Sequence, residues 1–402
     1  MLAARPGVQP LRIAGGPRRA RWYTPPMPDR FLITAPADSG NIDVLDASDP
    51  AAIRLRIRED GKAPFHQWFY FRVAGAAGTP LTLKIENAGS ASYVPGWTDY
   101  RAVTCEDGVT WPRVPTTYED GVLTIRFTPS QDVAWVAYFA PYGFNRAQIL
   151  LAETLASPLA MLVPLGTSVD GQPLDRVTVG GGPLKLWVIG RQHPGESMGS
   201  WWMDGFLPRL VDQDDPVAAS LREKATVHVV PMMNPDGVAR GHLRTNAAGT
   251  DLNRAWAEPD EATSPEVFCV RREMEALGCD FFLDVHGDEA IPNNFIAGAE
   301  GIPVWGDRLQ GLQDRFKSAL LDATPDFQTK DGYPIPAPGK ANPKIATNWV
   351  SQRFDCLGMT LEMPFKDAAV NPDQAYGWSP ERCKQLGRDC LTAIEAVVPH
   401  LR

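Results

Sequence analysis

The chain carries two different hydrophobic patterns, one after the other. Between 30 and about 140, apolar runs with the length of single β-strands alternate with Gly, Pro, Asp and Asn. Strands are expected at 53–57, 67–73, 81–85, 123–127 and 133–139. Short strands at this spacing predict an all-β sandwich or an open barrel.

A second pattern begins after a Pro- and Gly-containing break at 141–144, and a first helix is expected over 146–156. The expected strands are 176–179, 184–189, 226–230, 281–285 and 359–363. The expected helices are 197–210, 265–277, 304–321 and 380–397. Strands alternating with helices predict an α/β domain in which helices cover both faces of a mixed or parallel sheet.

The two patterns predict two domains. We expect an all-β sandwich domain over 27–150 and an α/β domain over 151–402, after an extension over 1–26. The extension is rich in Arg, has no Asp, Glu or Lys, and lacks the apolar stretch of about 7–15 residues of a secretory signal. It is interpreted as a disordered extension, or as the result of a start codon placed too early, with Met27 as the true start.

Composition and charge narrow the possible partners. Of the 402 residues, 44% are hydrophobic and 22% are charged, as in ordinary soluble proteins. No apolar run reaches the roughly 18 residues that span a bilayer, and the net charge of -9 argues against a nucleic-acid partner. The six cysteines form no Cys-x-x-Cys pair, which suits free thiols in a reducing compartment. We therefore expect a cytoplasmic protein that binds neither nucleic acid nor a membrane.

The first motif that carries chemistry lies between the expected strand 184–189 and the expected helix 197–210. The chain here reads Gly190-Arg191-Gln192-His193-Pro194-Gly195-Glu196. His193 and Glu196 thus occupy a strand-to-helix turn, where they can point to one place. Nitrogen and oxygen ligands of this kind suit zinc, and a catalytic zinc takes three protein ligands and a water. A His-x-x-Glu pair alone remains a weak signal, because such pairs are common as surface polar pairs.

Further candidates stand near the ends of other expected strands. His286 follows the strand 281–285, and Glu362 lies inside the apolar strand 359–363. Arg244, Asn253 and Arg254 lie in the loops after the strand 226–230. Because ligand sites of such sheets lie in loops at strand ends, we expect these side chains to gather at one edge of the sheet.

Taken one by one, these residues have ordinary structural explanations, such as a hydrogen-bonded core His or a paired buried acid. Together they supply what zinc-dependent hydrolysis of an amide requires. Two His and one Glu make an open three-ligand zinc site, whose bound water is acidic enough to attack near neutral pH. Another carboxylate can carry the proton of that water to the leaving amine. Guanidinium groups can stabilise an oxyanion or grip a terminal carboxylate.

The ordered set of motifs resembles the zinc metallocarboxypeptidases of the carboxypeptidase A type. The set comprises His193-Pro194-Gly195-Glu196, Asn234-Pro235-Asp236-Gly237, Arg244, Asp251-Leu252-Asn253-Arg254, Asp284-Val285-His286-Gly287 and Glu362. The resemblance covers about 177–396. Within that family the chain is similar to the cytosolic carboxypeptidases, whose catalytic domain follows a β-sandwich domain, as the β-rich region before 150 and the junction at 138–142 suggest.

The resemblance implies how a metal is held. His193, Glu196 and His286 would bind one zinc ion, and Glu362 would act as general acid and base. Asp284, two residues before His286, would either orient an imidazole from behind or simply close its strand. Both interpretations stay open at this point.

The resemblance also implies how a substrate is held. Arg244 would polarise the scissile carbonyl, and Asn253 and Arg254 would grip the C-terminal carboxylate of a peptide or protein. Secreted members of the family carry a mobile Tyr on a loop before the catalytic Glu. Tyr333 is the nearest candidate here, but its spacing from Glu362 does not align, and the role stays open.

The residue that is removed is a further expectation from the resemblance, because cytosolic carboxypeptidases typically trim acidic C-terminal residues. A pocket for Glu or Asp needs a cation at its base. The loop 328–344 offers Lys330, Lys340 and Lys344, and Lys340 is the leading candidate because small residues surround it.

Two other functions use the same residues. A zinc-dependent deacylase of small N-acyl amino acids, similar to aspartoacylase or succinylglutamate desuccinylase, shares a related metal pattern. An inactive, peptide-binding homologue is the second alternative. The order of the domains, with the β-sandwich first, favours the carboxypeptidase over the deacylase, and the complete set of metal and acid/base residues disfavours an inactive homologue.

Overall fold

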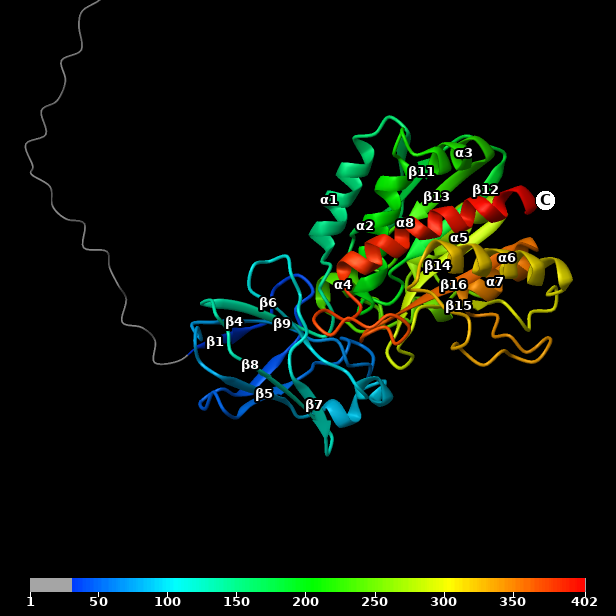
Figure 1. The fold of residues 1–402 in the computed structure, drawn as a ribbon. Coiled ribbons are helices and arrows are strands. Elements are labelled where there is room, and N and C mark those ends of the chain that lie inside the picture. Colours follow the sequence, from blue (N-terminus) through cyan, green and yellow to red (C-terminus); the bar gives the residue numbers. More distant parts are fainter. Residues whose placement is uncertain (1–30, 402) are drawn as a thin grey trace, which may run out of the picture.

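The computed structural model describes residues 31–401, so the extension expected over 1–26 lies outside the described residues. An all-β body formed by the N-terminal part of the chain lies beside a larger body of helices and strands (Figure 1). The fold class expected from the sequence, an α/β domain preceded by a domain of strands, is confirmed.

The N-terminal domain contains two sheets. One has the strand order β1-β4-β9-β6 and the other the order β2-β3-β5-β8-β7. The strands are β1 (Leu32–Thr34), β2 (Asp43–Asp46), β3 (Ile53–Arg56), β4 (Tyr70–Ala74), β5 (Leu81–Ile85), β6 (Val103–Cys105), β7 (Thr116–Glu119), β8 (Val122–Phe127) and β9 (Val133–Ala137). Two short 3-10 helices, η1 (Ala88–Ser90) and η2 (Val94–Trp97), lie between β5 and β6.

The strands that the sequence predicted are those with a clear hydrophobic pattern. In β3, for example, Ile53 and Leu55 are buried while Arg54 and Arg56 are exposed. All five expected strands are present as β3, β4, β5, β8 and β9, whereas β1, β2, β6 and β7 were not expected. The edge strands β2 and β7 contain no buried residue, so they lack the apolar alternation on which such a prediction depends.

The second domain is built on a seven-stranded mixed sheet with the order β10-β11-β13-β12-β14-β16-β15. Its four central strands run parallel, while β10, β11 and β15 pair antiparallel. The strands are β10 (Ala160–Thr167), β11 (Pro173–Val179), β12 (Leu184–Gly190), β13 (Ala225–Val230), β14 (Phe281–Asp288), β15 (Phe295–Gly298) and β16 (Leu357–Pro364).

Helices cover both faces of this sheet. Leu186 and Val188 of β12 belong to the core shared with α2, α6 and α8, whereas Trp187 and Ile189 belong to a second core with α5 and α7. The helices are α1 (Phe144–Leu155), α2 (Ser197–Leu210), α3 (Pro216–Lys224), α4 (Pro235–Arg240), α5 (Pro265–Leu277), α6 (Asp307–Ala323), α7 (Ala346–Phe354) and α8 (Pro380–Val397).

The long amphipathic helices agree closely with the sequence pattern. The bounds expected for α2, α5 and α8 are those observed, and α6 is displaced by two or three residues at each end. The helices α3, α4 and α7 were not expected, because they are short, and α3 and α4 begin at a Pro. Within residues 31–401, no helix is both long enough and apolar enough to cross a membrane.

Candidate metal centre and active-site cleft

The topology of the sheet brings three separate chain segments together. The strands β12, β14 and β16 lie side by side and parallel, so their carboxyl ends share one edge of the sheet. In the register, His286 of β14 stands opposite Glu362 of β16, and Gly190 of β12 stands opposite Val285. The turn after β12, which carries His193 and Glu196, therefore begins next to His286.

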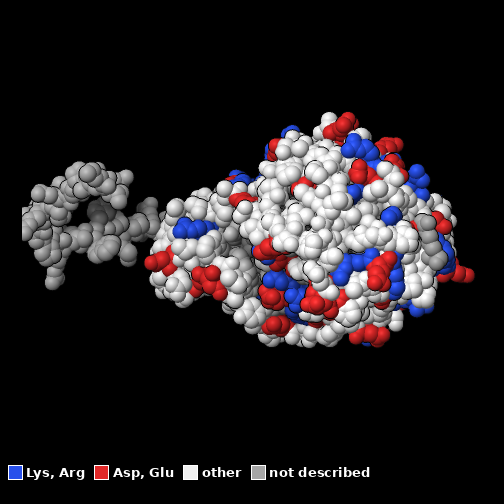
Figure 2. Space-filling model, turned by 90° about the horizontal axis from the view of Figure 1, so that it is seen from above, with Lys and Arg blue, Asp and Glu red and all other residues white. Residues whose placement is uncertain are grey.

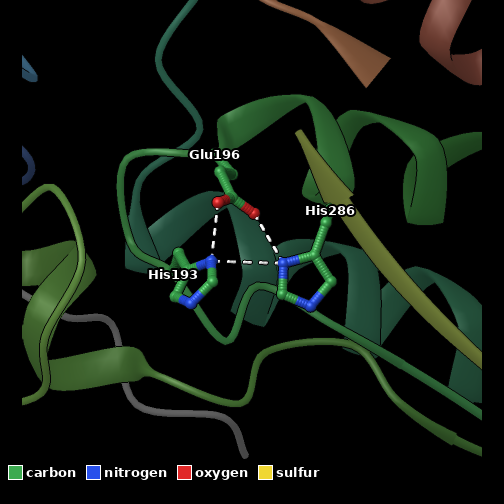
Figure 3. Close-up of side chains that lie close together, drawn as sticks. All are labelled: His193, Glu196 and His286. Carbon is green, nitrogen blue, oxygen red and sulfur yellow. Dashed lines mark hydrogen bonds and ion pairs between the residues drawn. The ribbon is translucent and has the colours of Figure 1, made fainter. Parts of the chain in front are cut away.

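The side chains of His193, Glu196 and His286 point toward one another at this edge (Figure 3). Glu196 Oε1 lies 2.6 Å from His193 Nδ1, and Glu196 Oε2 lies 2.8 Å from His286 Nδ1. The two Nδ1 atoms are 3.2 Å apart, and all three side chains are buried. Two imidazole nitrogens and a carboxylate that converge in this way form a donor set that fits zinc.

A carboxylate supports each of the two imidazoles from behind. Asp284 Oδ2 lies 2.8 Å from His286 Nε2, and Asp251 Oδ1 lies 3.1 Å from His193 Nε2. Each Nε2 can then carry the ring proton and leave the Nδ1 lone pair turned inward, which is the tautomer that a metal requires. Asp284 thus contacts the imidazole, which favours the first of the two interpretations that the sequence left open.

The charges around Glu196 keep its carboxylate ionised. Burial alone would raise the pKa of Glu196, but the two neighbouring imidazoles, in their protonated form, hold that pKa well below its usual range. Burial would also raise the pKa of Asp251, but His193 and Arg244 lower it instead. The two acids therefore remain available as a ligand and as a hydrogen-bond acceptor.

Glu362 is a buried acid of a different kind. It is 6% exposed, and its Oε2 has no hydrogen-bond partner among residues 31–401. Burial raises its pKa well above the usual range, although the nearby His286 opposes this shift. The Tyr333 hydroxyl lies 3.2 Å from Glu362 Oε1 and 2.8 Å from Asp288 Oδ2, so it can donate to either. The chain thus places Tyr333 beside Glu362 although the spacing along the sequence did not reveal it.

A cleft of about 760 Å³ opens at this site. Its lining includes His193, Glu196 and Glu362, as well as Arg244, Asn253 and Arg254. His286 is 2% exposed and lies behind this wall. Residues from both domains contribute, because Ser92, Tyr93 and Pro95 of the N-terminal domain also line the cleft.

Arg244 is held between the two domains. Its Nε donates to Asp251 Oδ2 at 2.7 Å, and its Nη1 donates to the hydroxyl of Tyr93. Burial would lower the pKa of Arg244, but Asp251 and Tyr93 raise it above its usual value, so the guanidinium is charged. Sequence reasoning missed Asp251 and Tyr93. Asp251 stands in a quoted motif without an assigned role, and Tyr93 has no motif around it.

Asn253 and Arg254 belong to a 3-10 helix, η3 (Leu252–Arg254), on another wall of the cleft. Asn253 is buried and accepts a hydrogen bond from the backbone of Ala346 at 2.9 Å. Arg254 is exposed, and its Nη1 donates to the carbonyl oxygen of Asn253 at 2.8 Å. A fixed amide and an exposed guanidinium side by side suit a carboxylate ligand.

Lys340 lies apart from the other candidate site residues. Its backbone N–H donates to the carbonyl oxygen of Ala337 at 2.9 Å in a surface turn, and its side chain is exposed and outside the lining of the cleft. Two other lysines, Lys317 of α6 and Lys330 of the loop after it, do line the cleft, and so does Glu300.

A mixed sheet with a His/Glu/His group and a buried acid at its carboxyl edge is the architecture of a metallohydrolase. Residues 151–385 match the family model described as zinc carboxypeptidase, and residues 33–139 match the model described as cytosolic carboxypeptidase N-terminal domain. The chain belongs to the zinc carboxypeptidase family and is a metallocarboxypeptidase, a hydrolase of peptide bonds, which confirms the resemblance stated above.

Known proteins resemble the chain over most of its length. An uncharacterised protein of Zymomonas mobilis is 49% identical over 369 residues, which are 92% of this chain and 97% of that protein. Mouse cytosolic carboxypeptidase 1 is 25% identical over 332 residues, or 69% of this chain, and the match spans 27% of that longer protein. Among solved structures, a metallo-carboxypeptidase from Pseudomonas aeruginosa in complex with (2-guanidinoethylmercapto)succinic acid is 46% identical with a TM-score of 0.90, covering 92% of this chain and 100% of that one.

Proposed function

We propose that this chain is a zinc-dependent carboxypeptidase that releases C-terminal residues from a peptide or protein. The observation that carries the proposal is the convergence of the donor atoms of His193, Glu196 and His286, all within 4.8 Å of one another, at a cleft that also contains Glu362. These three residues would hold one zinc ion. The ion would supply a bound water that is acidic enough to attack near neutral pH, and it would polarise the scissile carbonyl.

The other residues of the cleft would bind the substrate and move the proton. Asn253 and Arg254 would hold the C-terminal carboxylate, Arg254 through a two-bond fork. Glu362 would take the proton of the attacking water and deliver it to the leaving amine, a role that suits an acid without another hydrogen-bond partner at Oε2. Arg244 would stabilise the negative oxygen that develops on the substrate carbonyl.

Family membership and domain order support this function over the two alternatives. The domain described as the cytosolic carboxypeptidase N-terminal domain precedes the catalytic domain, which is the order that distinguishes a carboxypeptidase from a small-molecule deacylase here. All six cysteines are free thiols, and together with the name of the mouse relative this supports a location in the cytoplasm. On the face shown in Figure 2, acidic and basic side chains are interspersed, so that face offers no broad basic surface for nucleic acid.

For the residue released, we propose a preference for Glu or Asp. Because Lys340 lies outside the cleft lining, the cation of the pocket would be Lys317 or Lys330. Two observations favour the opposite charge. Glu300 also lines the cleft, and the ligand of the Pseudomonas aeruginosa structure carries a guanidino group as well as a succinic acid.

A residue-release assay on peptides ending in Glu, Leu and Lys tests both parts of the proposal. We expect release that stops with a chelator and returns with added zinc, and that is fastest for the peptide ending in Glu. If Lys is released fastest, Glu300 would be the residue that binds the side chain of the C-terminal residue. If Leu is released fastest, the proposal of a charged pocket is contradicted. No release from any peptide, with one zinc bound, would contradict the carboxypeptidase function itself.

A further inference from the structure

We infer that the N-terminal domain completes the active site: Tyr93 is a positioning residue for Arg244, and the loop that carries Arg244 is fixed by Asp60 of the same domain. The inference rests on the proposed function of Arg244 and extends it. Three sets of contacts support it: those of the backbone of the Arg244 loop, those of the guanidinium group, and those that anchor Tyr93.

The backbone of the Arg244 loop is bound by one buried carboxylate from the other domain. Asp60, 2% exposed, lies between β3 and β4. Its Oδ1 accepts from the N–H of Leu243 at 2.6 Å, and its Oδ2 accepts from the N–H of Arg244 and of Thr245, each at 2.8 Å. Hydrogen bonds to a charged acceptor are stronger than neutral ones, so Asp60 fixes three consecutive residues of a loop that lies more than 180 residues further along the chain.

The guanidinium of Arg244 is enclosed by aromatic rings of the N-terminal domain. Its Cζ lies 5.7 Å from the ring centres of both Phe65 and Tyr93, close enough for a cation–π attraction to each. The Tyr93 hydroxyl accepts from Nη1, while Asp251 accepts from Nε on the catalytic side. A planar group held by two directional hydrogen bonds has a defined orientation, and Arg244 and Tyr93 both line the cleft.

Tyr93 is itself anchored in the core of its domain. Gln67, 0% exposed, accepts from the N–H of Tyr93 at 2.7 Å and donates to its carbonyl oxygen at 3.1 Å. The same amide nitrogen donates to the hydroxyl of Tyr138 at 3.0 Å. The backbone of Tyr93 is therefore tied to the interior of the β domain, so a rigid element rather than a mobile loop places its hydroxyl against Arg244.

This geometry assigns Tyr93 an effect on the transition state. Arg244 would act on the negative oxygen that forms only during the reaction, so a misplaced guanidinium lowers kcat and leaves KM nearly unchanged. A hydrogen bond to a charged group is worth roughly tenfold in rate or affinity. We expect Tyr93→Phe, which removes only the hydroxyl, to lower kcat about tenfold with KM within about twofold of the parent.

The test is a double-mutant cycle between Tyr93→Phe and Arg244→Ala on the full, zinc-loaded chain. Two readouts are used: kcat and KM on the best peptide, and calorimetric affinity for tripeptide phosphonates ending in Glu, Leu or Lys, which imitate the tetrahedral intermediate. Tyr93→Phe should weaken phosphonate binding about tenfold and should have no further effect once Arg244 is Ala. Tyr118→Phe in β7, whose ring packs on Trp97 at 6.4 Å, is the matched control and should change neither readout.

Two results would overturn the inference. Unchanged phosphonate affinity and unchanged kcat in Tyr93→Phe would show that the hydroxyl does not position Arg244. A second tenfold loss in the Arg244→Ala background would show that Tyr93 acts on the substrate directly. If the parent protein releases no residue from any peptide, the proposed function fails, but the phosphonate cycle still decides the role of Tyr93. Phe65→Leu provides a second variant, with the same expected dependence on Arg244, if Tyr93→Phe does not fold.

Discussion

The surroundings of Glu362 are hard to explain by the stability of the fold alone. All eight residues of β16 are buried, and Glu362 is one of them. Its Oε2 has no hydrogen-bond partner within 31–401. Burying a polar group without a partner costs free energy, so stability alone would favour an apolar residue at this position. The same conflict was visible in the sequence, where a single Glu interrupts an apolar strand.

Replacing Glu362 by Gln should separate chemistry from metal binding. We expect kcat to fall by about a thousandfold or more, because the amide cannot carry the proton. Zinc content, measured by elemental analysis of the dialysed protein, should stay near one ion per chain as in the parent. Joint loss of zinc and activity would instead identify Glu362 as a ligand.

Glu266, at the start of α5, gives a pH-dependent prediction away from the cleft. It is 0% exposed, and burial raises its pKa to about 7. The folded protein therefore keeps a proton that the unfolded chain loses above about 4.5, so stability from this group is present at low pH and is lost as pH rises through 7. Glu266→Gln should increase the free energy of unfolding at pH 8 by up to about 3 kcal/mol and by almost nothing at pH 4.

Urea unfolding at both pH values measures this difference. The same substitution at Glu119, which is exposed in β7, serves as the control and should give a small change that is similar at both pH values. Destabilisation by Glu266→Gln at pH 8 would show that the ionised carboxylate has a stabilising partner in the fold.

At the scale of the elements, the close packing of α2 against α8 explains two glycines inside helices. A Cβ added at Gly205 of α2 would lie 1.9 Å from the carbonyl oxygen of Lys384, and one added at Gly387 of α8 would lie 2.3 Å from that of Trp202. Both neighbours are backbone atoms, which cannot turn aside. The two helices lie along each other on one face of the sheet (Figure 1), and their backbones can approach this closely only where glycine removes the side chain.

Gly205→Ala should therefore destabilise the protein, although alanine is the better helix former. We expect a loss of about 1–3 kcal/mol from overpacking, measured by chemical unfolding. Gly311→Ala in α6 is the matched control, because a Cβ there meets no atom within 4 Å, and it should stabilise by about 0.5–1 kcal/mol. Equal changes in the free energy of unfolding at the two positions would show that α2 and α8 can move apart without loss of stability.

At the scale of the whole molecule, the candidate metal centre connects elements that are far apart in the chain. His193 and Glu196 follow β12, and His286 belongs to β14. A metal bound by all three would bind the native state and not the unfolded chain, so it would stabilise the fold as a whole.

Zinc should consequently raise the midpoint of thermal unfolding, and a chelator should lower it. At a free zinc concentration a thousand times the dissociation constant, the gain is about 4 kcal/mol. Scanning calorimetry of the chelated protein with and without added zinc measures it. Magnesium, which prefers oxygen ligands in octahedral geometry, is the control and should give a much smaller shift; equal shifts would argue against a site built from two imidazoles.

The sequence by itself predicted two successive regions of different fold class and the residues of the candidate metal centre. Apolar residues recur along the chain with the period of a strand in β3 and with the period of a helix in α8. In the folded protein, the buried residues follow the same periods. The His-x-x-Glu turn, His286 and Glu362 were visible because their residue types stand at the ends of, or inside, apolar strands. Parallel strands in one sheet then bring such positions together.

Only the tertiary structure decided what surrounds that centre. Tyr93 and Asp60 contact the Arg244 loop across 150 residues or more of chain, and Tyr333 meets Glu362 from an irregular loop. Lys340, favoured because small residues surround it, lies in an exposed turn, whereas Lys317 lines the cleft from a helix that the sequence marked only by its apolar face. Contacts of this kind depend on how elements pack, and packing between distant segments leaves no periodic signal in the chain.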